Sequence, residues 1–191
     1  RLNTRLGFQE LYDARRAQGF AWTTADFDDR SWMSAVRLPR DRIRWSGEEK
    51  RDVPFLIERF EPFAGVRSVQ FVHSPTNTDS PRNLAAEIRA VRILRQAPEI
   101  AERARAALAS GRTLTFDPLP QSDSLALLFE LPTQSTGFPF VEIKSESGGE
   151  ELLWSYAELL HWDRFHQETH AETLFGDLYI ATQGRQEWQT C

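Results

Sequence analysis

The chain has 191 residues, of which 40% are hydrophobic and 27% are charged, a balance typical of a globular domain. Its net charge of -5 and its pI near 5.5 argue against a non-specific nucleic-acid binder, which needs a basic face to displace counterions from phosphates. The single cysteine, Cys191, excludes an internal disulfide, and no apolar run approaches the length of a membrane span.

Residues 1–52 are rich in arginine, aspartate and tryptophan and show no sustained periodicity. Asp28 and Ser31 favour a turn, because their short side chains hydrogen-bond to nearby backbone groups. Trp22 and Trp32 flank this turn as expected anchors. We therefore expect an arm that packs on the following domain, or the tail of an upstream β domain.

The middle of the chain combines one expected strand with one expected helix. Val66–Val72 alternates well enough for a strand. Pro98–Ser110 is the clearest helix, because proline suits a first helical turn and Gly111 is a ready C-terminal stop. The segment Leu84–Gln96 is ambiguous: its apolar residues fit a helical face, but Ile88–Leu94 also fits a strand.

The last third of the chain has the pattern of β-strands separated by glycine turns. Five strands are expected, at Ser124–Glu130, Phe138–Lys144, Glu151–Tyr156, Leu174–Ala181 and Gln186–Thr190. Turn signals lie at Ser147–Gly149 and at Gln183–Gly184, between successive pairs of strands. We therefore expect two hairpins.

Short strands at close spacing with turn signals predict a mainly β fold, an antiparallel β-sandwich with one or two inserted helices. We expect residues 1–52 to form the arm or upstream tail. Residues 53–191 would form the sandwich, with a helical insertion around residues 84–110. Because the chain starts without methionine and stops within an expected strand, we expect a piece of a longer protein, truncated at the C-terminus.

Five segments resemble a known family, and they occur along this chain in the same order as in that family. They are Tyr12–Arg16 (YDARR), Phe27–Trp32 (FDDRSW), Thr136–Ile143 (TGFPFVEI), Tyr156–Leu160 (YAELL) and Asp177–Trp188 (DLYIATQGRQEW). Together they resemble the β-sandwich module, of jelly-roll or concanavalin-like type, that precedes the catalytic domain of bacterial alpha-L-rhamnosidases and related glycoside hydrolases. The alanine-rich helical segment does not match the family's pattern, which leaves the subfamily open.

The resemblance implies a parent enzyme that removes terminal rhamnose, or a related sugar, from glycans or glycosides. Such enzymes invert configuration with two carboxylates, one protonating the leaving oxygen and one activating water. The catalytic domain, a helical toroid, would follow Cys191. Neither carboxylate maps onto this sequence, so we expect no catalytic residue, metal or cofactor here. The compartment stays open between the cytoplasm and secretion from a bacterium, since secreted bacterial enzymes often lack disulfides.

Two residues are candidate sugar contacts. Glu158 matches a glutamate that the family often shows at this point, and it either faces the sugar site or closes a turn at the end of a strand. Trp162 lies in a polar context, which favours an exposed side chain over a core position. We expect both to lie near carbohydrate if this chain contacts it at all.

Three further features have a simpler structural explanation. Arg40–Trp45 (RDRIRW) faintly resembles a segment near the catalytic acids of the toroid, but no second acidic motif follows it, and a solvated linker is the better explanation. His166 and His170 are one helical turn apart, yet two histidines do not supply the three or four ligands of a metal site. Trp154 and Trp188 suit either a sugar-stacking platform or the core, and their strands favour the core.

The expected partners are the chain's own C-terminal catalytic domain and possible carbohydrate, with no nucleic acid and no membrane. Two other functions stay open. A carbohydrate-binding module without catalysis predicts exposed coplanar aromatic side chains. A ligand-free structural sandwich predicts that the aromatic side chains are buried.

Overall fold

A computed structural model describes residues 10–17, 19–39, 52–54, 59–73, 84–117, 119, 124–156, 160–161, 164–165 and 175–190. The chain divides into two compact units. The larger unit contains residues 1–16 and 62–191, and the smaller contains residues 17–61. We expected one boundary at residue 52. The division instead has two boundaries, after residues 16 and 61, and the start of the chain belongs to the larger unit.

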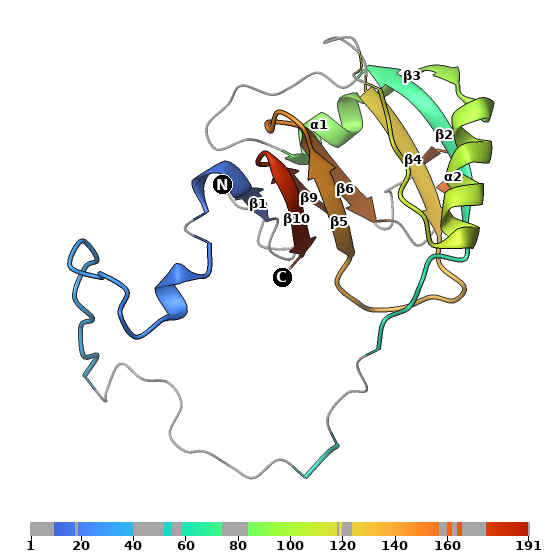
Figure 1. The fold of residues 1–191 in the computed structure, drawn as a ribbon. Coiled ribbons are helices and arrows are strands. Elements are labelled where there is room, and N and C mark those ends of the chain that lie inside the picture. Colours follow the sequence, from blue (N-terminus) through green and yellow to red (C-terminus); the bar gives the residue numbers. More distant parts are fainter. Residues whose placement is uncertain are drawn as a thin grey trace. The chain divides into compact units, whose positions relative to one another are not determined.

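The larger unit is mainly β, as predicted, and its sheets are antiparallel or mixed (Figure 1). Sheet I has the order β3 (Arg92–Gln96), β2 (Gly65–His73), β4 (Ser124–Glu130). Sheet II has the order β1 (Leu11–Asp13), β9 (Phe175–Ile180), β6 (Glu151–Tyr156). Sheet III pairs β10 (Gly184–Gln189) with β5 (Phe140–Ser145), and a short ladder pairs β7 (Leu160–His161) with β8 (Arg164–Phe165).

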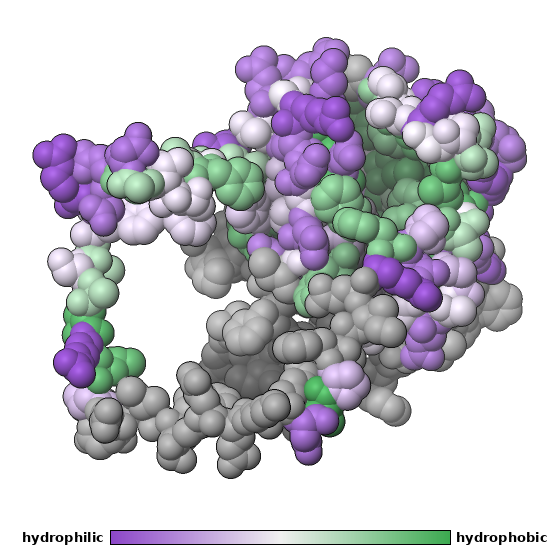
Figure 2. Space-filling view, turned by 60° about the horizontal axis from the view of Figure 1, so that its bottom comes forward, coloured by the Kyte–Doolittle hydropathy of each residue, from purple (hydrophilic) through white to green (hydrophobic). Residues whose placement is uncertain are grey.

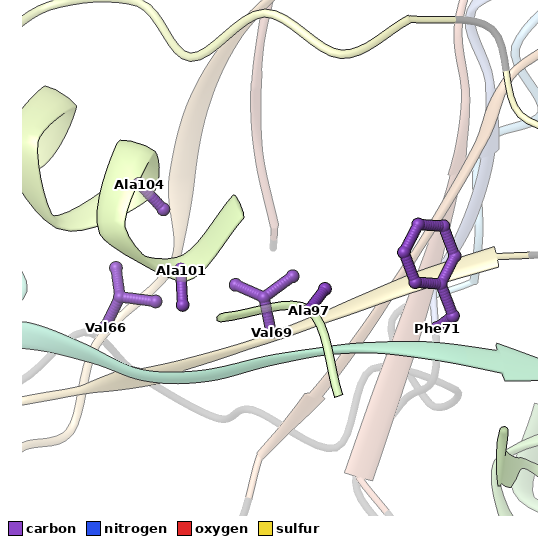
Figure 3. Packing of buried hydrophobic residues seen from close by; sticks show 6 residues of the cluster. All are labelled: Val66, Val69, Phe71, Ala97, Ala101 and Ala104. Atoms are coloured by element: carbon purple, nitrogen blue, oxygen red, sulfur yellow. The ribbon is translucent and has the colours of Figure 1, made fainter. Parts of the chain in front are cut away.

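Helix α2 (Pro98–Ser110) has the predicted bounds and covers one face of sheet I. Its first turn begins at the proline, and Gly111 ends it with a left-handed backbone, φ 62°. Figure 3 shows Ala101 and Ala104 pointing from the helix toward Val66 and Val69 of β2. Small side chains on the helix leave room for branched residues on the strand, so the two elements pack closely.

The ambiguous segment contains both predicted elements in succession. Helix α1 (Leu84–Ala90) comes first, and β3 follows it as an edge strand of sheet I. The expected helical insertion around residues 84–110 is therefore helix, strand, helix. Leu84 of α1 packs with Leu178 of β9 in a second core cluster. Gly176 allows this approach, because an ideal Cβ there would lie 2.5 Å from Cδ1 of Ile88.

The two predicted hairpins are wrong, although both turns are where the sequence places them. β5 pairs with β10 and not with β6, while β6 pairs with β9 and not with β10. Each glycine turn therefore carries the chain from one sheet to another. A hairpin and such a crossing turn use the same glycine-rich residues and the same flanking strands, so local sequence does not separate them.

The smaller unit contains a 3₁₀ turn, η2 (Ala21–Thr23), followed by further turns up to Trp32. A second 3₁₀ turn, η1 (Ala14–Arg16), belongs to the larger unit. None of the described residues of the smaller unit is buried. Its exposed large apolar side chains are Phe20, Trp22, Trp32, Met33, Val36, Leu38, Val53 and Phe60.

Candidate functional site

The two candidate sugar contacts, Glu158 and Trp162, lie outside the described residues. So do the segment Arg40–Trp45 and the histidines His166 and His170. Their roles stay predictions. The described parts of the chain nevertheless place the strands that lead into and out of the Glu158 and Trp162 segment.

A row of four aromatic side chains crosses sheets II and III. Tyr12 stacks on Tyr179 with ring centroids 5.7 Å apart and planes at 4°. Trp188 contacts Tyr179 at 4.9 Å and Trp154 at 6.2 Å. Tyr179 is 1% exposed and Trp188 is 5% exposed, which confirms core packing for Trp188. Trp154 belongs to the same cluster and is half-buried, so neither tryptophan forms an open sugar platform.

A polar cluster lies next to this row, since Asp177 of β9 is the register partner of Trp154. The Tyr156 hydroxyl donates to Oδ2 of Asp177 at 3.1 Å. The backbone N–H of Glu10 donates to Oδ1 at 2.8 Å, and the carbonyl of Glu10 accepts from Leu178 at 2.9 Å. Burial raises the pKa of Tyr156, and the nearby charge of Asp177 raises it further. The phenol is therefore a neutral donor at physiological pH.

The cluster fixes the point where the chain leaves sheet II toward Glu158. Tyr156 is the last residue of β6, and Glu158 follows two positions later. Sequence reasoning missed Asp177 and Tyr156 as partners. Tyr156 and Asp177 each begin a segment of the family resemblance, but nothing in the sequence pairs them. Glu10 meets Asp177 across 167 positions, and no local pattern reports such a contact.

The two crossing turns form a second polar site. The Glu150 carboxylate accepts from the hydroxyls of Ser145 at 2.6 Å and Ser147 at 3.3 Å. These hydrogen bonds, chiefly the one from Ser145, lower the pKa of Glu150. On the other turn, Oε1 of Gln186 accepts from the Tyr179 hydroxyl at 2.8 Å. Both carboxylate and amide are fully engaged in holding turns, which favours a structural role.

An open groove of about 310 Å³ lies at the C-terminal end of α2. Arg103 and Arg112 line it together with Leu114. Arg103 donates to the carbonyl of Thr115 at 2.7 Å, and Arg112 donates to the hydroxyl of Ser110 at 3.0 Å. Both guanidinium groups are thus engaged by neighbouring oxygens, and the carbonyl end of a helix carries partial negative charge, so these cations do not by themselves make an anion site.

The described residues contain no group of three or more histidine, cysteine, aspartate or glutamate side chains placed to hold a metal ion. Within those same residues, no helix is long and apolar enough to cross a membrane. Hydrophobic residues instead gather around a hollow on the end of the larger unit that faces the viewer in Figure 2. On the connection from β4 to β5, which runs along this end in Figure 1, Leu131 is 47% exposed and Phe138 is 63% exposed.

Comparison with known proteins does not assign the chain to a family. No family model matches the sequence. No curated protein and no solved structure matches it either.

Proposed function

We propose that this chain is the non-catalytic β-sandwich portion of an alpha-L-rhamnosidase-like glycoside hydrolase. In the parent enzyme it would brace the catalytic domain that removes terminal rhamnose or a related sugar. Sheets II and III would be the two layers of the sandwich, with the aromatic row as their shared core.

One observation carries the proposal: four of the five segments of the family resemblance meet at one place. Tyr12 and Tyr179 stack on each other, although 167 positions separate them. Trp188 and Val141 lie in the same cluster as Tyr179, and Tyr156 bonds to Asp177 beside it. Segments selected only for their resemblance in sequence thus form one packed unit, which is what a shared module requires.

The exposed apolar side chains on the connection from β4 to β5 support the bracing role. Phe138 lies within the resembling segment Thr136–Ile143, directly before β5. Contiguous exposed apolar surface on a domain marks a surface that another domain or protein covers. We infer that the catalytic domain covers this connection in the parent enzyme.

Hydrolysis of an aryl rhamnoside tests the proposal. The chain alone should show no turnover, and the same chain extended through the following catalytic domain should cleave the substrate. Turnover by the chain alone that disappears in Asp41→Asn or Glu158→Gln would refute the non-catalytic role. An extended chain that cleaves no rhamnoside or related glycoside would refute the parent class.

A carbohydrate-binding module is the second candidate, and the smaller unit favours it. Trp22 is 52% exposed and Trp32 is 48% exposed. A bidentate pair between Arg30 and Asp28, 2.6 Å at its shorter bond, fixes planar polar groups within four residues of Trp32 in the sequence. Sugar recognition uses such aromatic faces with polar neighbours.

Titration with rhamnose-containing oligosaccharides separates this candidate from a ligand-free sandwich. Binding followed by tryptophan fluorescence should disappear in Trp22→Ala and Trp32→Ala if the smaller unit is the module. Trp188→Phe is the matched control, because Trp188 is buried in the larger unit. If the unmodified chain shows no saturable binding signal, the ligand-free structural role is the one that remains.

A further inference from the structure

Strand β1 lies on the outer edge of β9, whose other edge pairs with β6 (Figure 1). Its three residues run parallel to Leu178, Tyr179 and Ile180. The N–H of Leu178 donates to the carbonyl of Glu10 at 2.9 Å, and the ring centroids of Tyr12 and Tyr179 lie 5.7 Å apart in a stack. The edge therefore holds an extended strand through its backbone and one aromatic contact.

The edge and its occupant differ in burial. Leu178 and Tyr179 of β9 are each 1% exposed, so the edge is part of the core. Its occupant, which we call the N-terminal segment, consists of residues Glu10–Arg16. None of these residues is buried, and Leu11 and Tyr12 are 48% and 39% exposed. A segment that buries so little of itself separates from the edge without disrupting the core.

The N-terminal segment is joined to the rest of the larger unit through residues 17–61, which form the smaller unit. At about 3.3 Å per residue, this connection spans up to about 150 Å when fully extended. The chain already leaves the larger unit after residue 16, so the N-terminal segment of a second copy would leave the edge of β9 in the same way. The connection therefore sets no steric barrier to exchange between copies.

The edge recognises its occupant at three positions. The N–H of Glu10 donates to Oδ1 of Asp177 at 2.8 Å, which fixes where the strand begins. Two residues later Tyr12 stacks on Tyr179, and two residues after that Ala14 packs in the aromatic cluster. An occupant thus needs an aromatic residue followed, at the second position, by a small one. A second copy of this chain carries that pattern in full.

We propose that the outer edge of β9 is an interaction surface for a second copy of this chain, and that two copies exchange their N-terminal segments. In the exchanged dimer each segment keeps the pairing, the hydrogen bonds and the ring stack that it has within one copy. The sheets need no rearrangement. The two arrangements differ only in whether the connection closes within one copy or between two.

The connection decides the concentration at which copies exchange. A tethered segment competes for its own edge at an effective concentration of about 1 mM. Since exchange replaces two tethered contacts by two identical ones, the dimer should become substantial as the chain approaches that concentration. Sedimentation of the full chain should show monomer at about 10 μM and a rising fraction of dimer toward about 1 mM.

An acetylated synthetic peptide of residues 10–16 tests the edge itself. It should bind the full chain carrying Tyr12→Ala with a dissociation constant of about 0.1–1 mM, because the chain's own segment has lost its ring stack. It should bind the unmodified chain about two- to tenfold more weakly, since the intact segment occupies the edge. The same peptide with alanine in place of its tyrosine should bind neither chain. Phe20→Ala, which removes an aromatic side chain that is 85% exposed in the smaller unit, is the matched control and should behave like the unmodified chain.

Amide hydrogen exchange on the unmodified chain gives a readout that does not depend on how a variant folds. Excess peptide should remove protection from the N–H of Glu10, because the displaced segment no longer reaches Asp177. The N–H of Leu178 should stay protected, since the peptide's first carbonyl takes the place of that of Glu10. The same excess of peptide should dissociate the dimer.

Several results would overturn the proposal. One is a full chain that stays monomeric at about 1 mM, and another is a dimer that excess peptide leaves intact. Equal binding of the peptide to the unmodified chain and to Tyr12→Ala would place the peptide away from the edge of β9. Equal binding of the tyrosine and alanine peptides would do the same.

Discussion

Gly148 and Gln183 meet so closely that there is no room for a side chain on Gly148. An ideal Cβ on Gly148 would lie 2.9 Å from the backbone nitrogen of Gln183. These residues belong to the two crossing turns, which hydrogen bonds hold together. Gly149 donates to the carbonyl of Ala181 at 2.8 Å, and Ala181 donates to the carbonyl of Glu150 at 2.9 Å. The connection between sheets II and III therefore depends on one pair of interlocked turns.

Replacing Gly148 with alanine should cost about 2–4 kcal/mol of unfolding free energy. The new Cβ would meet the backbone of the other turn, and its φ of +77° is unfavourable for any L residue. Urea unfolding measures the loss. Gly184→Ala, at φ +99° with open space around it, should cost only the backbone part, about 1 kcal/mol. Gly137→Ala has neither problem and should be neutral; equal effects of all three changes would contradict the close-packing argument.

The sequence was sufficient for local elements. Proline and glycine delimited α2 correctly, because each acts on the backbone of its own turn. The turn around Gly148 was likewise predicted. The pairing of the strands was not predicted, because the edges of a strand carry the same backbone groups whichever neighbour binds them. The choice between β5–β6 and β5–β10 is made by the aromatic cluster, where Trp188 packs on Tyr179.

Contacts between residues far apart in the chain were also not predictable from the sequence. β1 is three residues long and pairs in parallel with β9, so Tyr12 meets Tyr179 from the far end of the chain. Three residues are too few for periodicity to indicate a strand. The polar cluster around Asp177 depends on this pairing, because Glu10 precedes β1 directly. Sequence reasoning therefore missed that cluster together with the strand.

Acid should weaken the crossing turn through Glu150. Its hydrogen bonds lower its pKa in the folded chain from an ordinary value of 4.5. The stabilising contribution is therefore complete above about pH 4.5 and is lost as the pH falls through the folded pKa. Glu150→Gln should lower the melting temperature near neutral pH, and the difference from the unmodified chain should shrink below pH 4.5. A difference that stays constant with pH would show that the carboxylate charge is irrelevant. Glu99→Gln, exposed in α2, serves as the control.

Alkali should weaken sheet II through Tyr156. Its pKa is raised in the folded chain from an ordinary value of 10.0, chiefly by burial. The unfolded chain therefore releases this proton first, and stability falls as the pH rises above about 10. Tyr156→Phe should remove part of this alkaline loss, at the expense of the hydrogen bond to Asp177. Denaturant midpoints measured on both sides of that pH test the slope; identical slopes in the two chains would exclude Tyr156 as the source.

Arg105 should stabilise sheet I at a bulge in β2. The pairing of β2 with β4 shifts between Val66 and Ser68, so Arg67 is an extra residue. Nε of Arg105 donates to the carbonyl of Val66 at 2.9 Å, and Nη2 donates to that of Arg67 at 3.0 Å. Arg105→Met keeps the apolar stem over the sheet but removes both bonds, together with the exposed ion pair between Arg105 and Glu102 at 2.6 Å. Because the guanidinium is partly exposed, the expected loss is about 1–2 kcal/mol.

The matched control for Arg105 is Arg103→Met on the same helix. Arg103 donates once, to the exposed carbonyl of Thr115, so its loss should cost less than about 0.5 kcal/mol. Amide hydrogen exchange gives a second readout, since the backbone around Arg67 should lose protection in Arg105→Met and keep it in Arg103→Met. Equal destabilisation by the two changes would mean that helix propensity or surface charge, and not the bulge carbonyls, accounts for the effect. Loss of protection across all of β2 would instead show that Arg105 holds the whole helix on the sheet.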